Sequence, residues 1–174
     1  AITPSAQLVI RHEGAVAHDV AMGFLDPETK SRPVDHETLY DLASVTKLFS
    51  ATAFMTLVEE GKISIDDPVK TVLPEFSGAR PIQPYENPLD WGKRVSVPPL
   101  AEGEKRGARE NTVDADQVTF RNLLIHNSGL PAWRAFKDQP DADSAIRLAL
   151  ETFFSYPLGE RVVYSDVGLI LLGL

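Results

Sequence analysis

Residues 45–60 form a long stretch without proline or glycine, and this stretch constrains the fold more than any other feature of the chain. Drawn as a helix, its apolar and small side chains cover nearly the whole circumference, and Gly61 follows where a glycine often ends a helix. Lys47 is its only charged residue before Glu59. Because a helix that is apolar or small on every side is usually buried, the pattern predicts a central helix over Val45–Glu60.

Before this helix the chain has the two-residue period of β-strands. Residues 7–11 and 16–23 predict two strands joined by a turn at Glu13 and Gly14, and residues 38–42 predict a short third strand. Small and apolar residues on both sides of the second strand indicate that the hairpin packs against another layer.

After the helix the pattern is mostly helical. The predicted helices begin at Asp66-Asp67-Pro68, cover residues 120–126 and 141–154, and resume at Val167. Residues 79–115 have little periodicity and are rich in proline and charge, so we interpret them as a long inserted loop. Strands followed by helices predict the α+β class.

Composition excludes several classes of site. The net charge of −8 leaves no basic surface for nucleic acid, so no nucleic-acid partner is expected. The chain has no cysteine, which excludes disulfides, thiolate metal sites and cysteine nucleophiles. Its longest apolar run, residues 167–174, is too short to span a bilayer. None of this identifies a cellular compartment.

Ser44 and Lys47 form an S-x-x-K pair at the start of the predicted helix. Side chains three residues apart share a helix face, so the hydroxyl and the amine can meet. A serine becomes a nucleophile when a neighbouring base takes its proton, and a lysine whose pKa burial lowers can be or support that base. The spacing also arises by chance, but Lys47 has no carboxylate at helical spacing to pair with, which favours a function.

Tyr164 and Asp166 stand just before the last apolar segment. A phenol held near an ammonium loses its proton more easily and can relay it. Alternatively, Tyr164 is a half-buried core aromatic and Asp166 caps the following helix, and we expect some capping role for Asp166 in either case.

Three ordered segments resemble the serine β-lactamase and penicillin-binding-protein superfamily, which includes class C β-lactamases, family VIII esterases and D-aminopeptidases. Residues 42–47 (LASVTK) resemble its nucleophile motif, residues 123–131 (LLIHNSGLP) its LLTHTSGLP segment, and residues 164–173 (YSDVGLILLG) its YSNxGYxLLG segment. The resemblance covers most of residues 7–76 and 116–174.

The resemblance implies roles for four residues. Ser44 would be acylated, Lys47 would assist it, and Tyr164 would act as general base or proton relay. Asp166 occupies the position where the family usually has an asparagine that contacts the lysine and the substrate. A carboxylate there can pair with Lys47 and hold it charged, but it cannot donate as an amide can. His126 is expected to pack beneath the site rather than react.

The implied architecture is β-lactamase-like, with an antiparallel sheet flanked by helices and an all-α lobe. Residues 1–65 would be the N-terminal part of the α+β lobe, with the hairpin and nucleophile helix, and residues 66–174 the all-α lobe. The family also uses a downstream K-T-G or H-x-G strand that these residues lack. We therefore expect a C-terminal portion, either as a second chain from the same precursor or as further sequence of the same protein.

The implied activity is acyl-enzyme formation on an ester, amide or lactam carbonyl of a small molecule or peptide, without metal or organic cofactor. The asparagine-to-aspartate change favours an esterase or D-peptidase over a β-lactamase. The alternative is a catalytically silent binding or assembly module that retains the fold.

Overall fold

The computed structural model describes residues 3–90, 92–95 and 111–174. The chain divides into two compact units, Ala1–Ala43 and Ser44–Leu174. Among the described residues, the first unit contains a β-hairpin and its connections, and the second contains all the α-helices.

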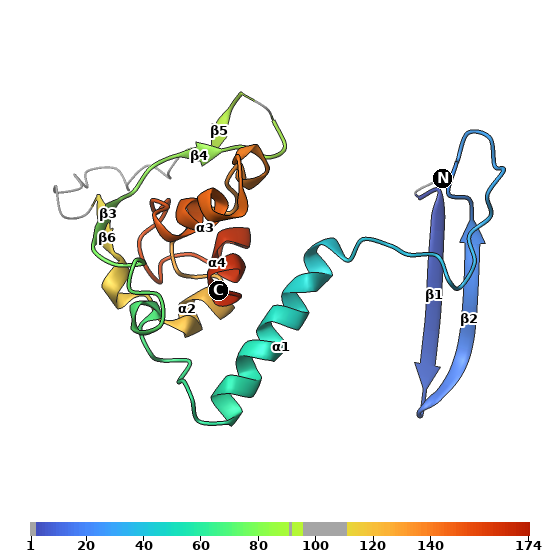
Figure 1. The fold of residues 1–174 in the computed structure, drawn as a ribbon, viewed down its shortest axis with the longest axis horizontal. Helices are drawn as coiled ribbons and strands as arrows, with labels where there is room; N and C mark the ends of the chain where they lie inside the picture. The colour runs from blue at the N-terminus through green and yellow to red at the C-terminus, as the bar shows by residue number, and fades with distance from the viewer. Residues whose placement is uncertain (1–2, 91, 96–110) are drawn as a thin grey trace. The chain divides into compact units, whose positions relative to one another are not determined.

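The first unit is the predicted hairpin. Strands β1 (Ser5–His12) and β2 (Ala15–Gly23) pair antiparallel (Figure 1). Their register changes between Ile10 and Arg11. Gly23 has a φ of +92°, and a Cβ there would lie 2.1 Å from the Pro4 carbonyl oxygen. Only glycine therefore fits where β2 ends.

The predicted strand over residues 38–42 is wrong, because the structure has no strand there. Its first residue belongs to a turn, in which the Thr38 hydroxyl donates to Asp35 Oδ1 at 3.0 Å and the Thr38 N–H donates to the Asp35 carbonyl at 3.3 Å. The Leu39 side chain is 95% exposed. β-Branched and aromatic residues favour strands only where a pairing partner and a packing surface exist.

In the second unit, helix α1 (Thr46–Glu59) confirms the predicted helix but not its burial. Phe54 is its only buried residue, and Leu48 and Phe49 are 68% and 62% exposed. Among the other helices α1 mainly contacts α4, and one neighbouring helix covers only one face. The prediction of a helix buried on every side is therefore wrong for the described part of this unit.

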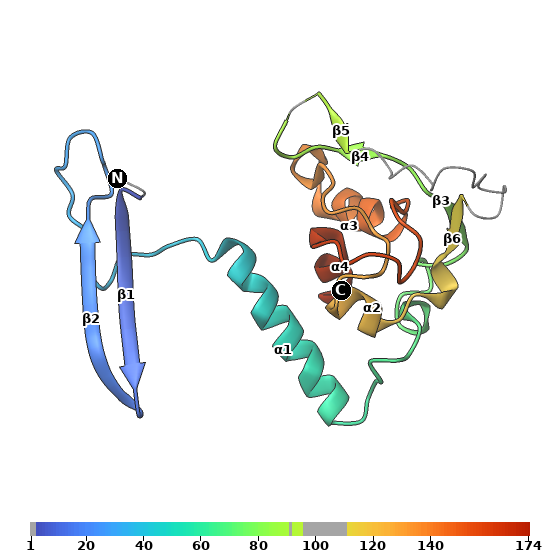
Figure 2. The ribbon, with the colours of Figure 1, turned by 180° about the vertical axis from the view of Figure 1, so that it is seen from behind.

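Three shorter helices complete the helical part of the second unit. They are α2 (Phe120–Leu124), α3 (Ala142–Leu150) and α4 (Asp166–Leu172), and α4 lies between α2 and α3 in both views (Figures 1 and 2). The helices predicted over 120–126, over 141–154 and from Val167 are confirmed, although α2 ends at Leu124 and α3 at Leu150. Their apolar faces share one core with α1, which includes Phe54, Val69, Phe76, Val118, Phe120, Leu123, Phe154, Val167 and Leu171.

The helix predicted to begin at Asp66-Asp67-Pro68 is only a 3₁₀ turn, η2 (Val69–Thr71). Pro74 explains its length, because a proline disfavours the helical conformation of the residue before it. The other 3₁₀ turns are η1 (Ala43–Val45), η3 (Ala115–Gln117) and η4 (Phe136–Asp138).

Much of the predicted loop at 79–115 lies outside the described residues, which omit 91 and 96–110. The described parts are more regular than expected. β3 (Ala79–Pro81) pairs with β6 (Thr112–Asp114), and β4 (Tyr85–Glu86) pairs with β5 (Arg94–Val95), both antiparallel. None of the described helices is long and apolar enough to cross a membrane.

Candidate active site

Ser44 lies in η1, immediately before α1, and Lys47 lies in the first turn of α1. The lysine Nζ donates a hydrogen bond of 3.3 Å to Ser44 Oγ. Ser44 is exposed, so an incoming group can reach its hydroxyl in this unit. The S-x-x-K spacing thus places the two side chains together, as the shared helix face predicts.

Lys47 makes an ion pair with Asp166 from α4, in which Nζ lies 2.6 Å from Oδ1. The lysine side chain is 19% exposed and the aspartate side chain 38%. Burial by itself lowers the pKa of Lys47, but the contacts with Asp166 and Tyr164 outweigh it, and the pKa is raised above its ordinary value. Of the two possibilities raised from the sequence, the contacts favour a Lys47 that the Asp166 carboxylate holds charged over a lysine whose pKa burial lowers, and the predicted Lys47–Asp166 contact is confirmed.

Tyr164 completes the cluster from the residues just before α4. Lys47 Nζ lies 4.9 Å from the centroid of its ring, and the ring is half-exposed. Hydrogen bonds with the side chains of Ser44 and Lys47, in that order, lower the pKa of Tyr164 below its ordinary value. The phenol is therefore the group of this cluster whose environment favours loss of a proton.

Asp166 is the first residue of α4 and not its cap, so the predicted capping role is wrong. Ser165 is the N-cap, and its hydroxyl accepts a hydrogen bond of 3.2 Å from the Gly168 N–H. The Ser165 hydroxyl also donates to the Pro131 carbonyl at 2.7 Å. Serine caps helices as well as aspartate does, so the sequence alone could not decide whether Ser165 or Asp166 caps α4.

His126 packs against the Tyr164 ring of this cluster. Its ring centroid is 4.9 Å from that of Tyr164, and its Nδ1 accepts a hydrogen bond of 3.1 Å from the Ser165 N–H. The expectation that His126 packs against the site is confirmed, and the expectation that it does not react stays a prediction. The ring contact could not be read from the sequence, because 38 residues separate the two aromatic rings along the chain.

The described residues contain no group of three or more histidine, cysteine, aspartate or glutamate side chains that could hold a metal ion. Two hollows lie elsewhere in the second unit, and neither is lined by a member of the Ser44 cluster. One is lined by residues of β3, β6 and η3 together with Pro157 and Leu158. The other is lined mostly by apolar residues, which come from α1, α2, α4 and the segments at 62–63 and 72–73.

The sequence is similar to one protein family and to several proteins with hydrolase names. The family model described as Beta-lactamase matches residues 2–174. The chain is 34% identical over 126 residues to Esterase EstB of Burkholderia gladioli, which covers 72% of this chain and 24% of the esterase. It is 28% identical over 185 residues to N-acetylmuramyl-L-alanine amidase of Bacillus subtilis (strain 168), which covers 98% of this chain and 36% of the amidase.

A solved structure of a class C beta lactamase has the same fold as this chain. It superposes with a TM-score of 0.66 at 22% sequence identity, covering 98% of this chain and 37% of that one. The predicted β-lactamase-like α+β class is thus confirmed. The chain spans about a quarter to a third of the length of the relatives that it matches.

Proposed function

The chain belongs to the Beta-lactamase family, and from that membership and the geometry of the Ser44 cluster we propose that it carries the nucleophile of a serine hydrolase. The reaction is acyl-enzyme formation on an ester or amide carbonyl. Esterase or D-peptidase chemistry fits the cluster better than lactam hydrolysis. The observation that carries this proposal is the Ser44 hydroxyl in contact with both the Lys47 amine and the Tyr164 phenol.

In the proposed first step, the Tyr164 oxygen takes the proton of Ser44 while Ser44 Oγ bonds to the carbonyl carbon of the substrate. The tetrahedral intermediate then collapses, the bond to the alcohol or amine breaks, and the proton passes from Tyr164 to that leaving group. Water hydrolyses the acyl-enzyme by the same path in reverse. The overall reaction consumes one water and needs no further reactant.

Tyr164 is a better candidate base than Lys47. The ion pair with Asp166 keeps Lys47 protonated near neutral pH, so the amine has no lone pair to accept the serine proton. A charged Lys47 instead stabilises the phenolate form of Tyr164, whose pKa is lowered by Ser44 and then by Lys47. Lys47 thus acts through its positive charge.

The start of α1 supports charge development at the same place. The first N–H groups of a helix have no partner within the helix, and the helix dipole favours negative charge there. Val45, the N-cap residue of α1, makes no side-chain hydrogen bond to them. We assign these N–H groups to stabilising the negative charge that develops beside Ser44.

The preference for esters and simple amides rests on Asp166. An asparagine at this position can donate its side-chain N–H to an acyl-amide oxygen, whereas a carboxylate only accepts. In this chain the Asp166 oxygen that contacts Lys47 is committed to the ion pair. The negative charge also disfavours an acidic substrate such as a penicillin.

The test compares three substrates with the full-length protein that contains this chain: p-nitrophenyl butyrate, D-alanyl-p-nitroanilide and nitrocefin. We expect turnover of the ester or the D-aminoacyl anilide, with nitrocefin the slowest. Ser44→Ala should lower that turnover about a thousand-fold or more. Ser50→Ala, on the same helix, is the matched control and should retain it. No turnover of any substrate, with no covalent adduct, would favour the silent binding module.

A further inference from the structure

The backbone on both sides of Tyr164 is held by one segment, residues 126–132. The Val163 N–H donates to the His126 carbonyl at 2.8 Å, and the Ser165 N–H donates to His126 Nδ1 at 3.1 Å. Two more bonds hold residues 165 and 166 against Pro131 and Ala132, at 2.7 and 2.9 Å. Tyr164 is therefore placed by this segment and not by burial of its own ring.

His126 makes both of the bonds that immediately flank Tyr164, one from its backbone and one from its side chain. Its ring also contacts the Tyr164 ring, at 4.9 Å between centroids and a tilt of 43°. His126 thus holds the backbone at residues 163 and 165, on either side of Tyr164, and also contacts the Tyr164 ring.

The backbone of His126 is in a conformation that favours other residues. Its φ is +60°, the left-handed region that glycine and asparagine adopt most easily. It occupies the C′ position after α2, where the His126 N–H donates to the Leu123 carbonyl and the Asn127 N–H to the Asn122 carbonyl. Glycine is the usual residue at C′ in this arrangement. Compared with glycine, a histidine at this position has a less favourable backbone conformation, but its side chain can contact Tyr164 and Ser165.

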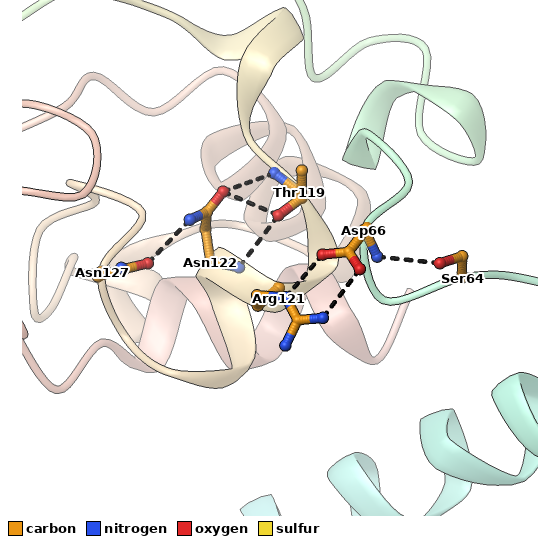
Figure 3. A network of polar contacts seen from close by, with 6 residues as sticks. All are labelled: Ser64, Asp66, Thr119, Arg121, Asn122 and Asn127. Carbon is orange, nitrogen blue, oxygen red and sulfur yellow. Dashed lines mark hydrogen bonds and ion pairs between the residues drawn. The ribbon is translucent and has the colours of Figure 1, made fainter.

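The turn that carries His126 is itself fixed by polar contacts (Figure 3). The Thr119 and Asn122 side chains form a capping box at the start of α2. The Asn122 side-chain N–H then donates to Asn127 Oδ1 at 2.9 Å, directly beside His126. The start of α2 and the turn after it are thereby tied together, which gives His126 a rigid support.

The hydrogen bond from Ser165 requires a neutral imidazole. Nδ1 accepts the Ser165 N–H, so in the neutral ring the proton lies on Nε2. The charged groups that act on His126 are Lys47 from α1 and Asp166 from α4. Burial, and then the Lys47 charge, lower the pKa of His126, and Asp166 opposes them. The neutral form is thus favoured at neutral pH, and protonation removes the acceptor.

We infer that His126 is a positioning residue for Tyr164, holding the backbone at 163 and 165 and the phenol ring in the orientation that the Ser44 cluster requires. This inference rests on the proposed role of Tyr164 as the base. His126 does not touch the reacting atoms and acts through Tyr164. Acidification that protonates the imidazole releases the Ser165 N–H and lowers the acylation rate.

Two substitutions separate the side chain of His126 from its backbone. Asn adopts the left-handed conformation, and its Oδ1 can accept the Ser165 N–H, but it does not titrate. Gly adopts the same conformation and supplies no acceptor and no ring. His126→Asn should retain acylation within about tenfold, whereas His126→Gly should lose about a hundred-fold, the size of effect that an error of 1 Å in position produces.

The experiment uses the full-length protein and measures acylation by a fluorophosphonate probe between pH 4.5 and 9. Wild type and His126→Asn should share the fall in rate that protonation of the Tyr164 phenol produces, and the wild type should show a further fall at lower pH that His126→Asn lacks. His126→Gly should lose kcat with little change in KM on the ester. A second readout needs no activity. The Tyr164 phenol, titrated by ultraviolet absorbance against Tyr164→Phe in each background, should keep its lowered pKa in His126→Asn and return toward the ordinary value in His126→Gly.

Equal losses in His126→Asn and His126→Gly, or the same further fall in rate at low pH in wild type and His126→Asn, would overturn the inference. A wild type that is never labelled at Ser44 would instead overturn the proposed function. The phenol titration still decides the positioning role in that case: a Tyr164 pKa that is the same in all three proteins refutes it.

Discussion

Lys47 contacts Ser44, Asp166 and Tyr164, and the balance between its burial and these contacts sets its charge. Burial disfavours the ammonium, while Asp166 and Tyr164 favour it, and the favourable contacts prevail. The S-x-x-K spacing suggests a lysine that can act as a base, whereas in this structure Asp166 and Tyr164 favour a Lys47 that stays positively charged. The consequence is that a single carboxylate at 166 determines which group of the cluster can accept a proton.

Replacing Asp166 by asparagine tests this balance directly. Without the carboxylate, burial remains and the pKa of Lys47 falls, so more of the lysine is neutral at a given pH. We expect Asp166→Asn to raise the ratio of kcat/KM on nitrocefin to that on p-nitrophenyl butyrate by about tenfold, which corresponds to ~1.4 kcal/mol. Asp143→Asn, in the first turn of α3, is the control and should leave the ratio unchanged. A wild type that already hydrolyses penicillins as fast as its best ester would contradict this account.

Lys47 and Tyr164 should behave as one proton-handling unit. We expect Lys47→Met and Tyr164→Phe each to lower the acylation rate about a hundred-fold or more, and the double variant to lose little beyond the larger single loss. Methionine keeps the apolar stem of the lysine, which protects the packing of α1. Losses that add fully on a logarithmic scale would show that the two residues act independently.

At the residue scale, the sequence predicted which side chains meet, and it left the charge of Lys47 open between a neutral base and a cation paired with Asp166. Helical spacing was enough to predict the contact between Ser44 and Lys47, because side chains three residues apart lie on the same face of a helix. The pKa of Lys47 depends on how far Asp166 lies from it, and that distance comes from the packing of α4 on α1. Spacing alone also could not assign the cap of α4 to Ser165.

At the scale of elements, α2 is short and depends on its ends. It has five residues, and the Thr119 hydroxyl accepts the Asn122 N–H at 3.3 Å and donates to Asn122 Oδ1 at 2.9 Å (Figure 3). The Arg121 side chain adds a bidentate ion pair with Asp66, at 2.6 and 2.8 Å, which joins α2 to the residues after α1. This pair is exposed, so the caps are expected to contribute more to stability than the pair does.

Thr119→Ala removes the hydroxyl of the capping box. We expect the free energy of unfolding to fall by about 1 kcal/mol, the usual loss when a capping threonine is replaced. Urea unfolding followed by circular dichroism measures it, and Thr119→Ser, which keeps a hydroxyl, should lose clearly less. If the alanine and serine variants are equally stable as the wild type, the capping box does not stabilise α2.

Helices and strands were predictable where the residue pattern and the turn or cap residues agreed. They were not predictable where contacts with other parts of the chain determine the structure. The hairpin has alternation and a turn, and α2 has its cap, so both were predicted. Residues 38–42 have strand-forming residues, but the Asp35–Thr38 turn and the lack of a pairing strand among the described residues leave them irregular. The exposure of Leu48 and Phe49 was likewise unpredictable, because their neighbours are set by tertiary packing.

At the scale of the whole molecule, the Ser44 cluster is assembled entirely within the second compact unit, Ser44–Leu174. The division into lobes at residues 65 and 66 stays a prediction, as does the second chain that would supply the downstream strand. The fold class was predictable because three motifs occur in a fixed order along the chain. The substrate was not, because no substrate-contacting surface beyond the cluster could be derived from those motifs.

The most direct test of the account is the site of acylation. The full-length protein is treated with a fluorophosphonate probe, its intact mass is measured, and the labelled peptide is sequenced by mass spectrometry. The account predicts one adduct per chain, on Ser44, and none in Ser44→Ala. An adduct on Ser128 or Ser165 that survives Ser44→Ala would contradict it.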